Sequence, residues 1–276
     1  TMANVIAYYQ TFKPPLARDV IRALDRLIVS SIHFNPPASI HLNDLPPSHF
    51  EEVFSMAKCT SLMVGGAGKA FEVLFSDYDT FFPLLLATLK KHPSISEVVL
   101  DVEEPTSSED LNRLIADLEG YDIAMSPCSF ALTDGGKGLG GFDYHDIKGC
   151  SRFYVQAYSP TLFTYDMYIR IKRLWPEQEI VMGCLASTVP LKDLVKVTEK
   201  MPSVALWDVG ASGGQDWVRA MEMRNLVQWS SQFCTNFERR QQINMFWRVA
   251  RERSLSLMRL PKCVANRILS YLFPGE

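Results

Sequence analysis

Short apolar runs alternate with amphipathic stretches of helical period along most of this sequence, and this alternation limits the possible folds most strongly. The apolar runs have few polar residues on either face, which is typical of parallel strands that are covered on both sides. Strands are expected at residues 5–9, 26–34, 39–42, 61–64, 98–101, 121–125, 153–156, 180–182 and 204–207. Helices are expected at residues 44–58, 77–91, 107–119, 161–174, 190–200 and 216–228.

The number of repeats favours a closed barrel. If residues 39–42 form a short extra strand, eight strand–helix repeats remain, which is the number in a (β/α)8 TIM barrel. A doubly wound open sheet is the alternative, but it requires a glycine-rich phosphate turn where this chain has QTFKPP after Tyr9. We therefore predict a barrel over residues 1–230, followed by a C-terminal helical extension over residues 231–276.

Charge and composition exclude several classes of partner. The net charge of −3 argues against a general affinity for nucleic acid or an anionic membrane. The longest apolar runs, such as FFPLLLATL, fall well short of the roughly 20 residues of a membrane-spanning helix. The six cysteines are scattered without metal-ligand spacing, so we expect neither a metal nor another cofactor. The opening residues lack a secretory signal, which suggests an intracellular location, or secretion if a signal has been removed.

The segment VVLDVEEP, residues 98–105, carries the most informative acidic residues. Side chains alternate along a strand, so Val99, Asp101 and Glu103 share one face. The opposite face is apolar as far as Glu104 and suits the helix layer, which turns Asp101 and Glu103 toward the barrel mouth. Two such carboxylates, about 7 Å apart along the strand, can keep one proton near neutral pH, as a general acid requires. Glu104 is expected to begin a solvated loop.

This segment, with Ser96 and Glu97 before it, resembles the DGxDxDxE strand of glycoside hydrolase family 18, which includes chitinases and endo-β-N-acetylglucosaminidases. The resemblance implies that Glu103 is the catalytic acid and that Asp101 is its neighbouring aspartate. The sequence departs from the pattern at Ser96, which replaces the first aspartate, and at Val99, which replaces the middle one. Without the middle aspartate, Asp101 would carry its negative charge alone.

Other segments resemble the same family in the same order over residues 5–228. Tyr158 stands at the tyrosine of the QxYN motif in FYVQAYSP, and Ser159 stands where asparagine is usual. The resemblance implies substrate-binding roles for Tyr9 in IAYYQ, Gly65 and Gly66 in SLMVGGAGKAF, Met125 in IAMSPCSF, Gln156 in FYVQAYSP and Trp207 in ALWDVG.

By this resemblance the protein is a retaining glycosidase that hydrolyses glycans of β-linked N-acetylglucosamine, with the substrate's own acetamido group as nucleophile. Glu103 would protonate the glycosidic oxygen, Asp101 would orient the acetamido group, and Tyr158 would donate a hydrogen bond to its oxygen. Each residue also has a simpler interpretation, with Tyr158 as a core aromatic and Trp207 as a packing residue. The alternative function is a weak or inactive chitinase-like protein that binds carbohydrate.

The C-terminal segment from residue 237 onward is rich in arginine and aromatic residues. Its end has Leu260, Val264, Ile268 and Leu272 at helical spacing and faintly resembles the first helix of an F-box-like ubiquitin-ligase adaptor. Residues 255–276 would then bind a protein partner. A helix that packs on the barrel explains the same spacing, and both interpretations stay open.

Overall fold

The computed structural model describes residues 3–10, 15–42 and 47–233. In these residues, eight parallel strands form one closed sheet, because β1 pairs with β9 on one side and with β2 on the other. The parallel strands are β1 (Asn4–Gln10), β2 (Arg26–Asn35), β4 (Thr60–Gly65), β5 (Ile95–Asp101), β6 (Asp122–Met125), β7 (Arg152–Gln156), β8 (Glu179–Cys184) and β9 (Ser203–Leu206). The short β3 (Ser39–Leu42) pairs antiparallel with the end of β2. The predicted (β/α)8 barrel is confirmed.

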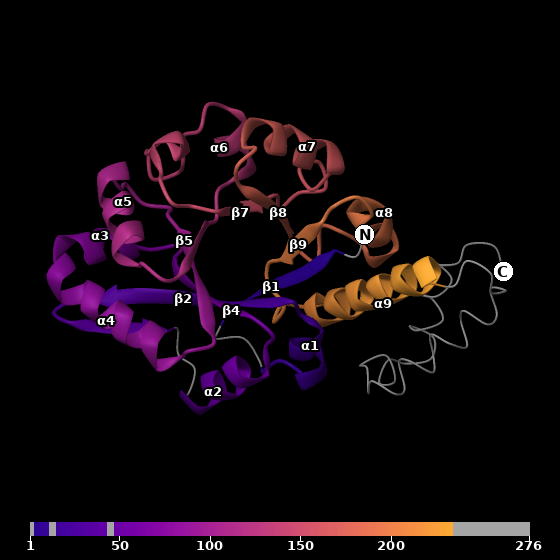
Figure 1. Cartoon of the computed structure of the whole chain (residues 1–276), viewed down its shortest axis with the longest axis horizontal. Helices are drawn as coiled ribbons and strands as arrows, with labels where there is room; N and C mark the ends of the chain where they lie inside the picture. The colour runs from indigo at the N-terminus through magenta and orange to yellow at the C-terminus, as the bar shows by residue number, and fades with distance from the viewer. Residues whose placement is uncertain (1–2, 11–14, 43–46, 234–276) are drawn as a thin grey trace.

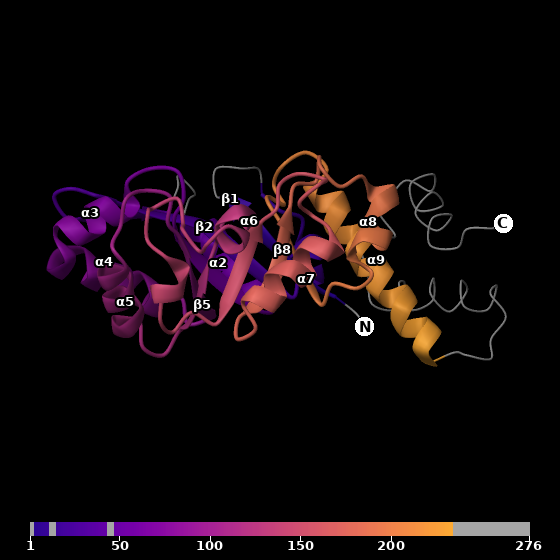
Figure 2. The same cartoon turned by 90° about the horizontal axis from the view of Figure 1, so that it is seen from above.

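Helices surround this barrel in both views of Figures 1 and 2. They are α1 (Arg18–Ala23), α2 (Pro47–Met56), α3 (Ala70–Ser76), α4 (Tyr78–Lys91), α5 (Ser108–Asp117), α6 (Ser129–Thr133), α7 (Tyr165–Leu174), α8 (Leu191–Thr198), α9 (Gly214–Phe233) and the 3-10 turn η1 (Tyr144–Asp146). The six expected helices are present; five of them are shorter than predicted, and α9 is longer at both ends. The sequence did not predict α1, α3 and α6, because helices of five to seven residues are too short to display a helical period.

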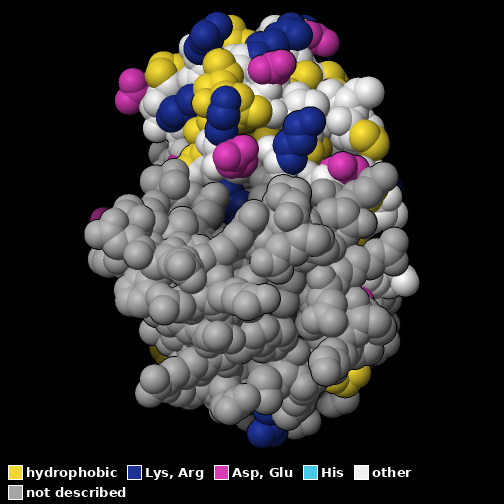
Figure 3. Space-filling model, turned by 90° about the vertical axis from the view of Figure 1, so that its right-hand side faces the viewer, with side chains coloured by type: hydrophobic (Ala, Val, Ile, Leu, Met, Phe, Trp, Pro, Cys, Tyr) yellow, Lys and Arg dark blue, Asp and Glu magenta, His cyan; other side chains and the backbone are white. Residues whose placement is uncertain are grey.

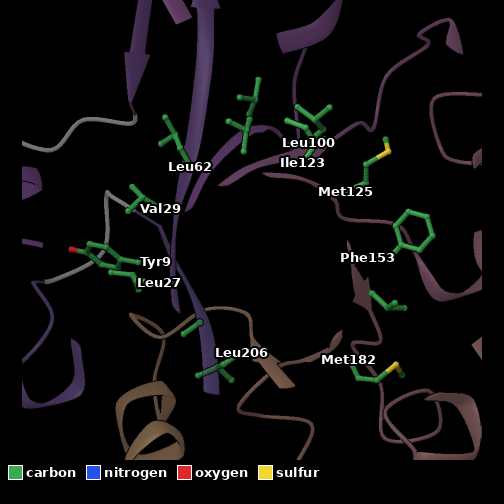
Figure 4. Packing of buried hydrophobic residues seen from close by; sticks show 14 of the residues in the cluster. Tyr9, Leu27, Val29, Leu62, Leu100, Ile123, Met125, Phe153, Met182 and Leu206 are labelled. Atoms are coloured by element: carbon green, nitrogen blue, oxygen red, sulfur yellow. The ribbon is translucent and has the colours of Figure 1, made fainter. Parts of the chain in front are cut away.

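The barrel strands carry two separate hydrophobic layers, because successive side chains point to opposite faces. The inner layer fills the barrel and consists of Ile6, Tyr8, Ile28, Met63, Val99, Ala124, Tyr154, Val181 and Ala205. The outer layer lies under the helices, and Figure 4 shows part of it as a ring of side chains around the strands. Val99 therefore lies inside, and Leu100 lies in the outer layer, as the alternation predicted for β5.

A buried polar network holds the N-terminal half of β5 to its neighbours inside the barrel. Glu97 is fully buried and accepts hydrogen bonds from the Ser61 hydroxyl (2.6 Å) and the Tyr154 hydroxyl (2.8 Å). It also forms ion pairs with Arg152 and with Arg26 (3.4 Å). A buried carboxylate needs such partners. Because Glu97 is held inward, strand alternation turns the residues two and four positions later inward as well.

One extra residue in β2 changes which side chains face the barrel mouth. Val29 pairs with Leu62, and Ile32 pairs with Val64. Between these two pairs β2 advances by three residues, while β4 advances by only two. This β-bulge inverts the alternation, so Val29 and Ile32 both lie in the outer layer. The two residues between them, and then His33, are directed toward the mouth of the barrel.

Among the described residues, no helix is long and apolar enough to cross a membrane. The part of the surface that is coloured in Figure 3 mixes acidic, basic and apolar side chains. The predicted C-terminal extension falls outside the described residues from residue 234 onward, and so does the segment 255–276 with its predicted protein partner.

Candidate active site

A pocket of about 400 Å³ opens at the C-terminal ends of the barrel strands. This is the end at which TIM-barrel enzymes carry their reactive groups, and the volume falls in the range of small-molecule sites. Side chains and backbone from six strands or the loops that follow them line it: Gln10, Ser30, Ser31, His33, Met63, Gly65, Gly66, Ala67, Asp101, Glu103, Gln156, Tyr158 and Trp207. Seven of the nine residues predicted for the site are in this set: Glu103, Asp101, Tyr158, Gly65, Gly66, Gln156 and Trp207.

Asp101 and Glu103 form a pair of carboxyl groups at the end of β5. Asp101 is only 5% exposed, and burial, with the charges of Glu103 and Glu104, raises its pKa to about 8. Glu103 is half-buried, and burial followed by the charge of Glu104 raises its pKa as well. Desolvation and like charge both disfavour the ionised forms. The pair therefore retains a proton near neutral pH and titrates as a coupled unit.

The Gln156 side chain holds Asp101 from β7. Its Nε2 donates to Asp101 Oδ1 (3.1 Å) and to the Ser126 carbonyl (3.0 Å), while the Cys128 thiol donates to its Oε1 (3.5 Å). Burial and the neighbouring carboxylates raise the pKa of Cys128 to about 11, so the sulfur keeps its proton and acts as a donor. These contacts orient the amide with its NH2 group toward Asp101. The sequence did not suggest this role for Ser126 or Cys128.

Two glycines let the β4 turn pass directly against Asp101. Gly65 and Gly66 both have φ near +92°, a conformation that glycine adopts without penalty. A Cβ atom on Gly65 would lie 2.4 Å from the Asp101 carbonyl oxygen, and the Gly66 N–H donates to that oxygen (2.7 Å). Only glycine fits at position 65, so the turn brings backbone, not side chains, to the wall of the pocket.

Aromatic side chains form the opposite side of the pocket. The Trp207 ring lies at the end of β9, with its centroid 5.0 Å from that of Tyr8 and 6.4 Å from that of Tyr158. Burial and the charge of Asp101 raise the pKa of Tyr158 well above its usual range, so its hydroxyl keeps its proton and can donate a hydrogen bond. The indole is partly exposed and offers an apolar face to the pocket.

Two predicted substrate-binding residues lie elsewhere. Tyr9 and Met125 are fully buried in the outer layer and do not line the pocket. Figure 4 shows both among the side chains that surround the barrel strands. Alternation explains this placement: on β1 it is Tyr8 that points inward, and on β6 it is Ala124. Neither side chain lines the pocket, so the geometry does not support the substrate-binding roles implied for Tyr9 and Met125.

Glu104 is also not where it was expected. It faces the helix layer as predicted, but it is buried and does not begin a solvated loop. Its Oε1 accepts a hydrogen bond from the Phe71 N–H in the first turn of α3. The loop at residues 135–141 covers it, since the Thr106 N–H donates to the Gly140 carbonyl (3.1 Å) and a Cβ on Gly140 would lie 2.6 Å from the Glu104 carbonyl oxygen.

Several residues at the mouth of the pocket were not predicted. Ser30, Ser31 and His33 all line it; Ser30 follows the alternation from Ile28, and the bulge in β2 turns Ser31 and His33 to the same side. The run RLIVSSIHF contained a signal, since polar residues interrupt an apolar strand near its C-terminal end.

Among the described residues, no group of three or more histidine, cysteine or acidic side chains could hold a metal ion.

Comparisons with known proteins agree with this architecture. A fungal endo-β-N-acetylglucosaminidase of glycoside hydrolase family 18 matches with a TM-score of 0.63 and 24% identity, over 82% of this chain and 98% of that chain. A family 18 chitinase from Pseudoalteromonas aurantia matches with a TM-score of 0.62 and 14% identity, over 80% and 100% of the two chains. The fold is that of glycoside hydrolase family 18.

A family 18 chitinase from Flavobacterium johnsoniae has the same barrel, with a TM-score of 0.58 and 10% identity over 80% of this chain and 94% of that chain. No protein-family model matches the sequence, and no curated protein matches it. At these identities, the family 18 likeness shows the arrangement of strands and helices.

Proposed function

We propose that this protein is a retaining glycosidase that hydrolyses glycans of β-linked N-acetylglucosamine, either chitin-type oligosaccharides or the core of an N-glycan. The observation that carries the proposal is that Asp101 and Glu103 line the same pocket as Tyr158 and Trp207. The names of the structural neighbours, an endo-β-N-acetylglucosaminidase and two chitinases, support this substrate class.

Glu103 is the acid in this proposal. It transfers its proton to the glycosidic oxygen as the bond from that oxygen to C1 of the sugar breaks. The carbonyl oxygen of the substrate's acetamido group attacks C1 from the other side and forms an oxazolinium ring. A water molecule then attacks C1, returns a proton to Glu103 and opens the ring, so that the anomeric configuration is retained.

Asp101, Tyr158 and Trp207 assist that step. Ionised Asp101 accepts the acetamido N–H and stabilises the positive charge that develops on the ring. The Tyr158 hydroxyl donates to the acetamido oxygen, and the Trp207 indole supports the apolar face of the sugar. The Gln156 amide, held by Ser126 and Cys128, keeps Asp101 in one orientation.

The shared proton must lie on Glu103 when the bond breaks. In the free pocket the proton lies mainly on Asp101, the more deeply buried acid, because the pKa of Asp101 is raised to about 8. An acetamido N–H that donates to Asp101 favours the ionised form of that carboxylate. Substrate binding would therefore shift the proton toward Glu103, the more exposed of the two acids.

Hydrolysis of a chromogenic chitobioside and of a high-mannose glycopeptide tests the proposal, with the wild-type protein and Glu103→Gln compared. We expect turnover of at least one substrate by the wild type and near-complete loss in the variant, which keeps the shape of the side chain without its acid. Glu109→Gln, at an acidic residue in the first turn of α5 that does not line the pocket, is the matched control. Equal rates in wild type and Glu103→Gln would refute the assignment.

A second candidate function is carbohydrate binding without hydrolysis, and Val99 is the observation that favours it. The side chain below Asp101 on the inward face of β5 is apolar and fully buried, so no second carboxylate shares the proton of Asp101 from below. If Asp101 stays protonated with substrate bound, the oxazolinium ring loses its counter-charge. Binding of the same glycans without any turnover by the wild type would support this alternative.

A further inference from the structure

The β2–β3 hairpin carries a polar face that continues from the mouth of the pocket. His33 pairs with His41, and Asn35 pairs with Ser39, so these four side chains and that of Ser31 share one face of the hairpin. The opposite face carries Phe34 and Ile40, among others, and packs on the outer core. We call the five residues Ser31, His33, Asn35, Ser39 and His41 the hairpin face.

The hairpin face stands beyond the C-terminal edge of the barrel. The last residue of β2 that pairs with β1 is Ser30, and the last that pairs with β4 is Ile32. The following residues of β2 pair with β3 alone. Ser31 and His33 also line the pocket, so the hairpin face is a direct extension of its wall.

Its side chains are hydrogen-bonding groups held in a fixed arrangement. The Ser31 hydroxyl bonds to His33 Nε2 (3.0 Å), and the Asn35 amide bonds to His41 Nδ1 (2.7 Å). The two imidazoles lie 5.9 Å apart between centroids and are tilted by 32°. In the part of the chain that the structure describes, the second ring nitrogen of each histidine has no hydrogen-bond partner.

The loop after β4 supports this arrangement and leaves it accessible. A Cβ atom on Gly68 would lie 3.5 Å from Cε1 of the His33 ring, so the loop passes close to that ring. Asn35, Ser39 and His41 are exposed. Burial and the nearby His41 lower the pKa of His33, so its ring is neutral near pH 7 and can both donate and accept. The serine hydroxyls, the Asn35 amide and a neutral His33 ring suit the hydroxyls of a sugar.

We infer that the hairpin face is a second sugar-binding surface, which contacts a glycan residue beyond the one seated at Glu103 and Trp207. The inference rests on the proposed function and deepens it. Asn35, Ser39 and His41 lie outside the pocket, so they can contact a glycan only if it extends past the bond that is cleaved. The substrate is therefore an extended glycan, and the protein binds several sugar residues at once.

The test uses the full chain with Glu103→Gln, so that ligands bind without turnover. Calorimetry measures the Kd for N,N′-diacetylchitobiose, for its hexasaccharide homologue and for a high-mannose glycopeptide. The variants are Asn35→Ala with His41→Ala, two exposed residues outside the pocket, and His145→Ala as a control at an exposed histidine that does not line it. Melting temperatures check that each variant is folded.

We expect the double variant to bind at least one of the two extended ligands about tenfold more weakly, which is the effect of losing one or two neutral hydrogen bonds. The disaccharide should change by less than about twofold, and His145→Ala should change nothing. Unchanged affinity for both extended ligands, or an equal loss for the disaccharide, would overturn the inference while the proposed function stands. If the Glu103→Gln protein binds none of the three ligands, the proposed function fails, and the inference fails with it.

Discussion

The buried carboxyl group of Asp101 should reduce the stability of the protein as the pH rises. Its pKa is raised from 3.8 to about 8, chiefly by burial. Between these two values the folded protein holds a proton on Asp101 that the unfolded chain has released, so the free energy of unfolding falls with increasing pH. The contribution is absent below about pH 4, grows up to about pH 8 and is then constant.

The magnitude follows from the size of this shift. Each pKa unit corresponds to about 1.4 kcal/mol, so about three units between pH 4 and pH 7 give at most about 4 kcal/mol at pH 7. Relaxation and solvent around the pocket reduce the value, and we expect about 2 kcal/mol or more. Asp101→Asn removes the titration and keeps an acceptor for the Gln156 amide. The variant should therefore be more stable than the wild type at pH 7, by an amount that vanishes near pH 4.

Urea unfolding of the wild type and Asp101→Asn at pH 4.5, 6, 7 and 8 measures this difference. The control is Asp79→Asn, at an aspartate whose side chain is 95% exposed, and it should show no comparable pH dependence. A difference between wild type and Asp101→Asn that is constant from pH 4.5 to pH 8 would refute the reasoning. A variant that becomes less stable than the wild type as the pH rises would refute it as well. The same substitution should abolish the proposed hydrolysis, because an amide cannot supply the negative charge beside the oxazolinium ring.

Three further perturbations test the geometry of the pocket. The value of kcat/KM should fall about tenfold per pH unit above pH 8, because the Asp101–Glu103 pair loses its proton there. A pH–rate profile that stays level to pH 10 would contradict this prediction. Gly65→Ala should destabilise the protein by about 3 kcal/mol in urea unfolding, and by clearly more than Gly120→Ala, which shares a positive φ but has open space around it. Val99→Asp should cost about 3 kcal/mol or more, because it buries a second acid inside the barrel; unchanged stability would indicate that this interior admits water.

The sequence by itself determined the architecture, because the alternation of strand-like and helical periods is a local property. It also predicted which face of β5 enters the barrel, since the apolar residues at 98, 100 and 102 leave only one face for Val99, Asp101 and Glu103. In IAYYQ the same reasoning fails, because two adjacent tyrosines carry no information about which one points inward. Only pairing with the neighbouring strands assigns Tyr8 to the interior.

Tertiary structure decided the environment of the carboxyl groups and the shape of the mouth. Asp101 receives its hydrogen bond from Gln156 and has its exposure limited by the Gly65–Gly66 turn, and both are remote from it in sequence. Glu104 is buried because a loop more than thirty residues later covers it. The bulge in β2 turns His33 toward the pocket through its register with β4. Strand register and loop packing depend on partners that are distant along the chain, so a local pattern does not encode them.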